Sequence, residues 1–243
     1  ILNNTYIKDL TSIISISYFK EDYLERYIKY LSSNTLERET AITYVNIGLD
    51  NDYYTNVVDI TNQDDLLVLV NKYHKLSNNY APSDLETINS KYQWLGRSNQ
   101  LRHDAKIAFE EMCEAATKDN IYIYAGSGYR SYATQKALYN RYVNQDGFAA
   151  AETYSARASY SEHQTGLAMD IANKSGFISK GDKEYEWLVN NSYKYGFILR
   201  YPEGKEKITG YMYEEWHYRY LGKDVAKDVY NSKLTYDEYL AKK

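Results

Sequence analysis

The sequence has few of the residues that define several common protein classes. Its 243 residues include one cysteine and two prolines, so no disulfide can form within the chain. No run of about 18 apolar residues occurs, so the sequence predicts no membrane-spanning helix. Positive charge is not in excess, since the formal net charge is -4. That balance argues against a protein that binds nucleic acid by neutralising phosphates.

The rest of the composition is that of a globular protein. Hydrophobic residues make up 44% of the chain and charged residues 26%, which excludes wholesale disorder. The length is sufficient for one large domain or for a catalytic domain with a small partner. Because the chain begins at Ile1 rather than Met, we expect a mature form, with any signal or anchor in a removed upstream segment.

Two regions are predicted. Residues 1–62 form a small helical module, because apolar residues recur at helical spacing over 23–31 and a second helix is predicted over 36–44. This module carries no chemical motif, and we interpret it as a stalk or docking element. Residues 63–243 form the larger second domain.

The second domain mixes helices and short strands. Amphipathic or apolar runs predict strands over 66–73, 166–171 and 208–218, with a further strand leading into the glycine turn at 126–128. Helices are predicted over 102–118, 133–143 and 184–195, with a helical tail from 225. This order predicts an α+β fold with an antiparallel sheet. Cys113 lies on the apolar stripe of its helix, so we expect a core residue rather than a reactive thiol.

One of the four histidines stands directly before a predicted strand. In a strand, successive side chains point to opposite faces, so Leu167 and Met169 share one face and Asp170 lies on the other. Gly166 permits a close approach or an unusual backbone angle. His163 precedes this strand and is predicted to meet Asp170 at one small ion.

A second histidine lies in an acidic and aromatic cluster near the end of the chain. Two histidines and one carboxylate are the ligand set of a catalytic zinc site, which keeps a fourth position open for water. Such chemistry also needs a carboxylate that is not a ligand, to move the proton of the attacking water. Strand alternation favours Glu215 for this role, because it would share a face with His217, whereas only a bend or turn would favour Glu214.

At this point a family resemblance becomes apparent. The pattern SxHxxGxAxD at 161–170 followed by ExWH at 214–217 resembles the zinc D-alanyl-D-alanine carboxypeptidases of the VanY type. These enzymes share a fold group with lysostaphin, the D-Ala-D-Ala metallopeptidases and the hedgehog signalling domain. GYRS at 128–131 and the run 195–211 also resemble this family, and the likeness covers roughly residues 66–222. The resemblance implies a small antiparallel sheet that carries the zinc site and is flanked by helices.

The resemblance also implies roles for individual residues. It implies that one Zn²⁺ ion is held by three ligands: His163, Asp170 and His217. It implies Glu214 as the general base and acid, against simple strand alternation. It implies that Arg130 binds the substrate or the developing oxyanion, for which a fixed guanidinium is suited. Ser161 and Gln135 are implied as further substrate contacts.

The sequence departs from the family pattern at two places. Ala158 and Ser159 stand where many relatives have Pro-Gly, which would change the rigidity of this loop. Glu215 stands where many relatives have proline, and its charge would raise the pKa of Glu214 if it lay nearby. Neither change removes an implied ligand, so we expect an active enzyme.

The resemblance implies a zinc carboxypeptidase that removes the C-terminal D-alanine of peptidoglycan stem peptides, with D,D-carboxypeptidase activity favoured. An L,D-carboxypeptidase, an L-Ala-D-Glu endopeptidase and a non-catalytic zinc module that binds the wall are the alternatives. We expect a monomer on the cell-wall side of the membrane of a Gram-positive bacterium, with a stem peptide as its partner and no nucleic acid.

Overall fold

The computed structural model describes residues 12–243. Its α-helices are α2 Leu24–Ser33, α3 Arg38–Ile47, α4 His103–Lys118, α5 Tyr132–Asp146, α6 Phe148–Tyr154, α7 Lys183–Asn191, α8 Glu206–Thr209, α9 Lys223–Ser232 and α10 Tyr236–Ala241. Its 3-10 helices are η1 Glu21–Tyr23, η2 Ser90–Tyr92, η3 Trp94–Gly96, η4 Glu162–Thr165 and η5 Ser192–Tyr195. Its strands are β1 Val58–Asp59, β2 His74–Lys75, β3 Leu85–Thr87, β4 Gln100–Arg102, β5 Tyr124–Ser127, β6 Ala168–Ala172, β7 Phe197–Leu199 and β8 His217–Tyr220.

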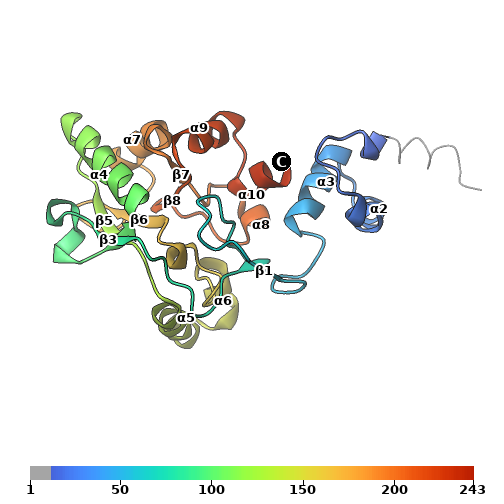
Figure 1. Cartoon of the computed structure of the whole chain (residues 1–243), viewed down its shortest axis with the longest axis horizontal. Helices are drawn as coiled ribbons and strands as arrows, with labels where there is room; N and C mark the ends of the chain where they lie inside the picture. The colour runs from blue at the N-terminus through green and yellow to red at the C-terminus, as the bar shows by residue number, and fades with distance from the viewer. Residues whose placement is uncertain (1–11) are drawn as a thin grey trace, which may run out of the picture.

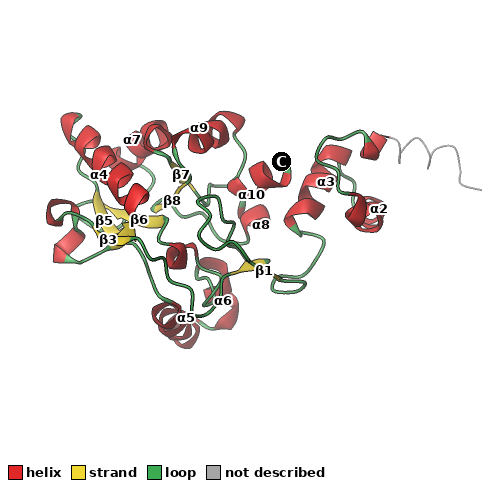
Figure 2. Ribbon diagram, in the orientation of Figure 1, coloured by secondary structure: helices red, strands yellow, loops and turns green. Residues whose placement is uncertain are grey.

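A four-stranded antiparallel sheet forms the centre of the larger domain (Figure 2). Its strand order is β5-β6-β8-β7. Strands β6 and β8 are therefore neighbours, although 44 residues lie between them in the sequence. Met169 on β6 lies opposite Tyr218 on β8, and Asp170 lies opposite His217. The α+β class and the antiparallel sheet predicted from the sequence are therefore confirmed.

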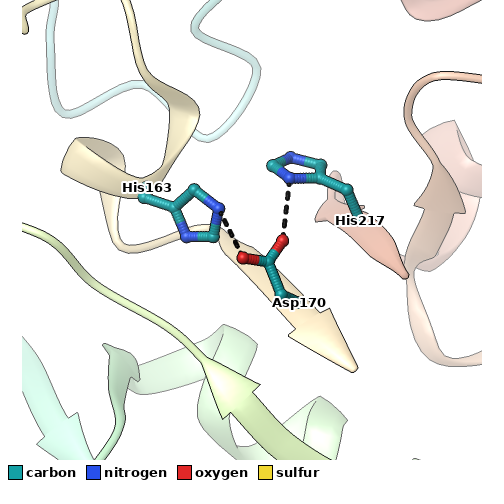
Figure 3. A group of neighbouring side chains, drawn as sticks. All are labelled: His163, Asp170 and His217. Carbon is teal, nitrogen blue, oxygen red and sulfur yellow. Dashed lines mark hydrogen bonds and ion pairs between the residues drawn. The ribbon is translucent and has the colours of Figure 1, made fainter. Parts of the chain in front are cut away.

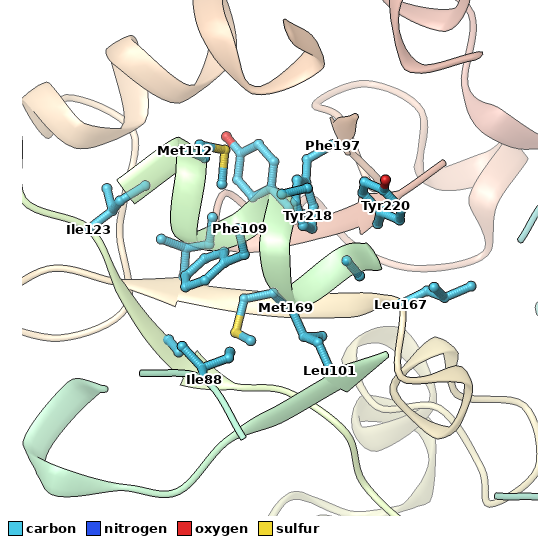
Figure 4. Packing of buried hydrophobic residues seen from close by; sticks show 14 of the residues in the cluster. Ile88, Leu101, Phe109, Met112, Ile123, Leu167, Met169, Phe197, Tyr218 and Tyr220 are labelled. Atoms are coloured by element: carbon cyan, nitrogen blue, oxygen red, sulfur yellow. The ribbon is translucent and has the colours of Figure 1, made fainter. Parts of the chain in front are cut away.

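Helix α4 covers one face of this sheet (Figure 4). Phe109 and Met112 of α4 join Met169 of β6 and Tyr218 of β8 in the largest buried apolar cluster among the described residues. Burying a side chain of this size contributes about 1.5–3 kcal/mol to folding. Cys113 is buried in the same cluster, and burial raises the pKa of its thiol. The prediction that Cys113 is a core residue is confirmed.

The helices α2 and α3 lie apart from the sheet, beside the C-terminal helix α10 (Figure 1). Tyr27, Ile42 and Val45 are buried in a small apolar cluster of their own. The contact with the rest of the chain includes the side-chain amide of Asn46, which donates to the carbonyl of Ala241 at 2.9 Å. The domain boundary near residue 62 stays a prediction, and residues 1–11 of the predicted module lie outside the described residues.

The strand predicted over 66–73 is wrong, because this apolar segment is irregular and mostly buried. The carbonyl groups of its first three residues are satisfied by side chains instead of a neighbouring strand. The Arg219 guanidinium donates to the carbonyls of Leu66 and Val68 at 3.0 and 2.8 Å, and the Tyr236 hydroxyl donates to that of Leu67 at 2.6 Å. Buried backbone groups need partners, but these need not come from a sheet.

The strand predicted over 208–218 is also wrong for most of its length, because β8 begins only at His217. Residues 206–209 form α8, which ends at Gly210 with a φ of +78°. The backbone amide of Met212 donates to Thr153, and that of Glu214 donates to Tyr201. Several elements escaped prediction because they are short or lack clear periodicity, among them α6, β7 and the β1-β2 and β3-β4 pairs.

No helix among residues 12–243 has both the length and the apolar character needed to cross a membrane.

Gly166 is the glycine at which we expect the fold to be most sensitive near the site. It has a φ of +66°, and an added Cβ would lie 2.8 Å from Cδ2 of Leu85 and 3.0 Å from Cγ of Arg102. Left-handed strain and overpacking together predict that Gly166→Ala lowers the free energy of unfolding by about 2–4 kcal/mol. Denaturant unfolding of the metal-free protein measures this. Gly176→Ala is the matched control, because its Cβ would enter open space, and equal stability of the two variants would contradict the prediction.

Candidate metal centre and active site

Neighbouring strands and a short helix bring three potential metal ligands together. Asp170 of β6 and His217 of β8 lie directly opposite each other in the antiparallel register. His163 lies in η4, the single turn that precedes β6. The strand alternation predicted here is present. Leu167 and Met169 lie in the core, whereas Asp170 lines the pocket on the opposite face. The ligands therefore lie on the face opposite α4.

The three side chains point toward one another (Figure 3). Oδ2 of Asp170 lies 3.2 Å from Nε2 of His163, and its Oδ1 lies 3.1 Å from Nδ1 of His217. One ligand atom from each residue lies within 4.8 Å of the others, and all three residues are buried. Burial opposes ionisation of Asp170, but His163 and His217 outweigh it and hold the pKa of this carboxyl well below its usual range.

The hydrogen bonds of His163 fix which ring nitrogen is available to a metal. Its Nδ1 lies 2.8 Å from the carbonyl of Gly128, and a carbonyl can only accept, so Nδ1 carries the hydrogen. Burial, followed by the charge of Arg130, lowers the pKa of His163 to about 4. Its Nε2 is buried and has no hydrogen-bond partner. A buried, unprotonated nitrogen without a donor is an orphan that a metal ion would satisfy, so the donor set fits zinc.

His217 is held between two carboxylates. Its Nδ1 faces Asp170, while its Nε2 lies 3.3 Å from Oε2 of Glu162. Burial lowers the pKa of His217, but hydrogen bonds to Asp170 and Glu162 outweigh it and raise the pKa to about 9. Glu162 thus keeps a hydrogen on Nε2, while Nδ1 faces Asp170. A carboxylate that orients a metal-binding histidine in this way is a recurring feature of zinc sites.

Glu162 is itself the centre of a buried charge cluster. Its Oε1 accepts from Arg200 at 2.8 Å and from Arg219 at 3.0 Å. Arg200 also donates to Asp237 of α10 at 2.6 Å. The side chains of Glu162, Arg200, Arg219 and Asp237 are fully buried. Burial opposes ionisation of Glu162, but the two arginines outweigh it and hold its pKa well below the usual range.

The turn before β8 decides which glutamate enters the site. The amide of His217 lies 3.4 Å from the carbonyl of Glu214, so residues 214–217 form a turn and strand alternation does not apply. Glu214 lines the pocket with Oε2 3.6 Å from Nδ1 of His217. Burial raises the pKa of Glu214 to about 8. The like charges that add to this are Asp170 and Glu162. The expected influence of Glu215 on this pKa stays a prediction.

The remaining predicted site residues line the same pocket, which has a volume of about 1050 Å³. Nη2 of Arg130 lies 3.5 Å from Oδ2 of Asp170. Gln135 of α5 donates through Nε2 to the carbonyl of Ala156 at 2.7 Å, and its buried Oε1 has no partner. Ser161 is buried beside η4 and also lines the pocket.

The loop before η4 is held by hydrogen bonds instead of a Pro-Gly pair. Ser159 adopts a φ of 74°, a left-handed conformation that costs a non-glycine residue about 1–2 kcal/mol. Its hydroxyl donates to Oδ1 of Asn78 at 2.8 Å, and its carbonyl accepts from the amide of Leu76 at 2.9 Å. These bonds offset the strain and tie the loop to residues 76–78.

The sequence reasoning assigned no role to Glu162, although it directly precedes His163. An acidic residue beside a predicted ligand was the available signal. The role of Glu162 depends on its contacts with Arg200 and Arg219, which lie 38 and 57 residues further along the chain. The other two histidines, His74 and His103, lie outside the site and contact Asn71 and Glu86.

A buried His-Asp-His cluster, a non-ligand glutamate and an arginine in one pocket define a metallopeptidase-type site. The family model for VanY, D-alanyl-D-alanine carboxypeptidase, matches residues 98–223. The chain is 39% identical over 208 residues to the putative carboxypeptidase YodJ of Bacillus subtilis, which covers 80% of this chain and 76% of that protein. The chain belongs to the VanY family of metallo-carboxypeptidases.

Solved structures of similar proteins agree with this assignment. The LdcB LD-carboxypeptidase superposes with a TM-score of 0.72 at 39% identity, covering 79% of this chain and 94% of that one. The vancomycin-resistance D,D-pentapeptidase VanY from a VanB-type cassette, solved with Zn(II), gives a TM-score of 0.60 at 37% identity, covering 72% and 98%. The His-Asp-His cluster of this chain could hold such an ion.

Glu162 gives the clearest test of how the site is held. Glu162→Gln removes the charge that faces two buried arginines, so we expect a loss of about 3–5 kcal/mol in the free energy of unfolding. It also weakens the orientation of His217, so zinc affinity should fall by about 10- to 100-fold. Chelator competition and denaturant unfolding measure the two effects.

Asp237→Asn is the matched control for this test. It removes a carboxylate from the same cluster but not one that contacts His217. We expect it to destabilise the fold while leaving zinc affinity nearly unchanged. An equal loss of zinc affinity in both variants would mean that Glu162 acts only through the stability of the cluster.

Proposed function

We propose that this protein is a zinc carboxypeptidase that removes the C-terminal D-alanine from peptidoglycan stem peptides. The observation that carries the proposal is the orphaned Nε2 of His163 beside Asp170 and His217, with Glu214 and Arg130 in the same pocket. This combination supplies a metal position, a proton carrier and a cation within one site.

In this proposal His163, Asp170 and His217 hold the zinc ion. When bound, zinc supplies Lewis acidity that activates water and polarises the scissile carbonyl. The Gly128 carbonyl and the Glu162 carboxylate keep the two imidazoles in the orientation needed for this ligand set. Three protein ligands leave a position open for catalysis.

Glu214 acts as the proton carrier. Its carboxylate takes the proton of the attacking water and delivers it to the nitrogen of the leaving D-alanine. A buried glutamate with a raised pKa is suited to both steps, because it neither binds the proton too weakly nor releases it too slowly.

Arg130, Ser161 and Gln135 bind the substrate. The guanidinium of Arg130 faces the metal position and stabilises negative charge on the reacting carbonyl or the terminal carboxylate. Gln135 lines the pocket, and its bond to the carbonyl of Ala156 fixes its side-chain amide there. A side-chain amide can both donate to and accept from a peptide.

Removal of D-alanine from the pentapeptide is the first candidate, since the matching family model describes a D-alanyl-D-alanine carboxypeptidase. Removal from the tetrapeptide is the second. It is favoured by the likeness to LdcB, which has a higher TM-score than the D,D-pentapeptidase VanY, 0.72 against 0.60. Either activity would place the protein on the cell-wall side of the membrane in wall remodelling, where it would act as a monomer.

The role of Glu214 is tested against its neighbour. Glu214→Gln is expected to lower kcat by about 10²–10⁴-fold, because the proton carrier is lost while the zinc ligands remain. Glu215→Gln should retain nearly full activity, since Glu215 does not line the pocket. Alanine release and zinc content are measured for both variants. Full turnover by Glu214→Gln would overturn the assignment.

The reaction itself is tested by mass spectrometry on stem peptides that end in D-Ala-D-Ala and in a single D-Ala. Loss of one alanine from the pentapeptide alone would establish a D,D-carboxypeptidase, and loss from the tetrapeptide alone an L,D-carboxypeptidase. A chelator should abolish release and added zinc should restore it. Stable peptides in the presence of zinc-loaded protein would contradict the proposed function.

A further inference from the structure

The active-site pocket extends well beyond the metal position. Its lining carboxylates, Glu162, Asp170 and Glu214, are all at the metal centre. Besides Arg130 at the metal centre, two further charged side chains line it, Arg97 and Arg141, and both are exposed. The pocket is therefore positive away from the metal, although the whole chain carries a net charge of -4. Local charge of this kind selects a ligand that carries the opposite sign.

Arg141 has no carboxylate partner among residues 12–243; the interaction it makes is with the ring of Tyr142, 5.3 Å from the guanidinium carbon. The acidic side chains nearest to Arg141 in sequence already accept hydrogen bonds from other residues. Glu152 accepts from Arg157 and from Tyr139, and Asp146 accepts from Tyr154. Arg97 differs, because it donates to the carbonyl of Gly126 at 3.0 Å.

Helix α5 places Arg141 on the same face as the predicted substrate contact Gln135. Gln135, Leu138, Arg141 and Tyr142 line the pocket at the three- and four-residue spacing of one helical face. At 1.5 Å per residue, Arg141 lies about 9 Å further along the helix axis than Gln135. An extended peptide covers this distance in about three residues. Figure 1 shows α5 lying against α6. Tyr154 of α6 also lines the pocket.

We propose that Arg141 binds a free carboxylate of the stem peptide, two or three residues from the bond that is cut. This inference rests on the proposed function and names a specificity determinant for it. A stem peptide offers two such groups: the α-carboxylate of its D-glutamate and the side-chain carboxylate of meso-diaminopimelate. Both can be converted to amides, so Arg141 would make the enzyme sensitive to amidation of the wall peptide. The guanidinium of Arg141 can form a bidentate pair with such a carboxylate.

The test uses synthetic peptides of the sequence L-Ala-γ-D-Glu-meso-diaminopimelate, extended by one or by two D-alanines. Each length is made in three forms. In the first both carboxylates are free, in the second the D-glutamate is amidated, and in the third the diaminopimelate is amidated. For the wild-type protein, amidation of the recognised carboxylate should raise KM about tenfold with little change in kcat. The second and third peptides distinguish the two sources of the carboxylate.

Arg141→Gln should show the raised KM with the free peptide and no further loss on amidation, and Arg141→Lys should restore part of the difference. Lys136→Gln is the matched control, because it removes one positive charge from the exposed surface of α5 outside the pocket. We expect it to behave like the wild type. An equal rise in KM for all peptides, or none, in Arg141→Gln would overturn the proposal.

A binding measurement separates this proposal from the proposed function. Calorimetric titration of the same peptides into zinc-loaded Glu214→Gln, with and without Arg141→Gln, reports the carboxylate contact without turnover. Affinity that depends on both the carboxylate and Arg141 supports the proposal even if no alanine is released. Absence of release by the wild type from every peptide would overturn the proposed function instead.

Discussion

The buried carboxylate of Glu162 is the interaction on which the rest of the structure depends. It faces two guanidiniums on one side and the imidazole of His217 on the other. With Asp237, the cluster contains two carboxylates and two guanidiniums, so its formal charge is zero. Each ion would be costly to bury alone, and the group is tolerable only because every member is paired.

This cluster also joins parts of the chain that are far apart in sequence. Arg219 donates to two backbone carbonyls of the irregular segment 66–68. Arg200 donates to Asp237 and so contacts α10. Asp237 in turn accepts from the side-chain amide of Asn71 at 2.9 Å. The loop before the sheet, the C-terminal helix and the proposed zinc ligand His217 therefore share one set of hydrogen bonds. Shared bonds of this kind fix the orientation of His217 before any ligand arrives.

The sequence predicts most of what is local. Alternation in 167–170 predicts which side chains face the core, and the apolar stripe of α4 predicts its buried face, Cys113 included. Prediction from the sequence fails where a segment makes its hydrogen bonds with residues far away in the chain. Residues 66–73 have the composition of a strand, but their partners are side chains about 150 residues away, Arg219 among them. The choice between Glu214 and Glu215 follows from a turn that alternation does not contain, so the family resemblance was needed to anticipate it.

The distribution of charge in the pocket explains how an acidic protein can accept an anionic peptide. At physiological salt a net charge of -4 is screened within about 8 Å, so it repels a distant ligand only weakly. Inside the pocket, the carboxylates are matched at the metal centre by arginines, imidazoles and the zinc site. The guanidiniums that remain, Arg97 and Arg141, then set the sign of the field that a peptide meets. If Arg141 binds the peptide as we propose, substrate preference depends on this local cation more than on the overall charge of the chain.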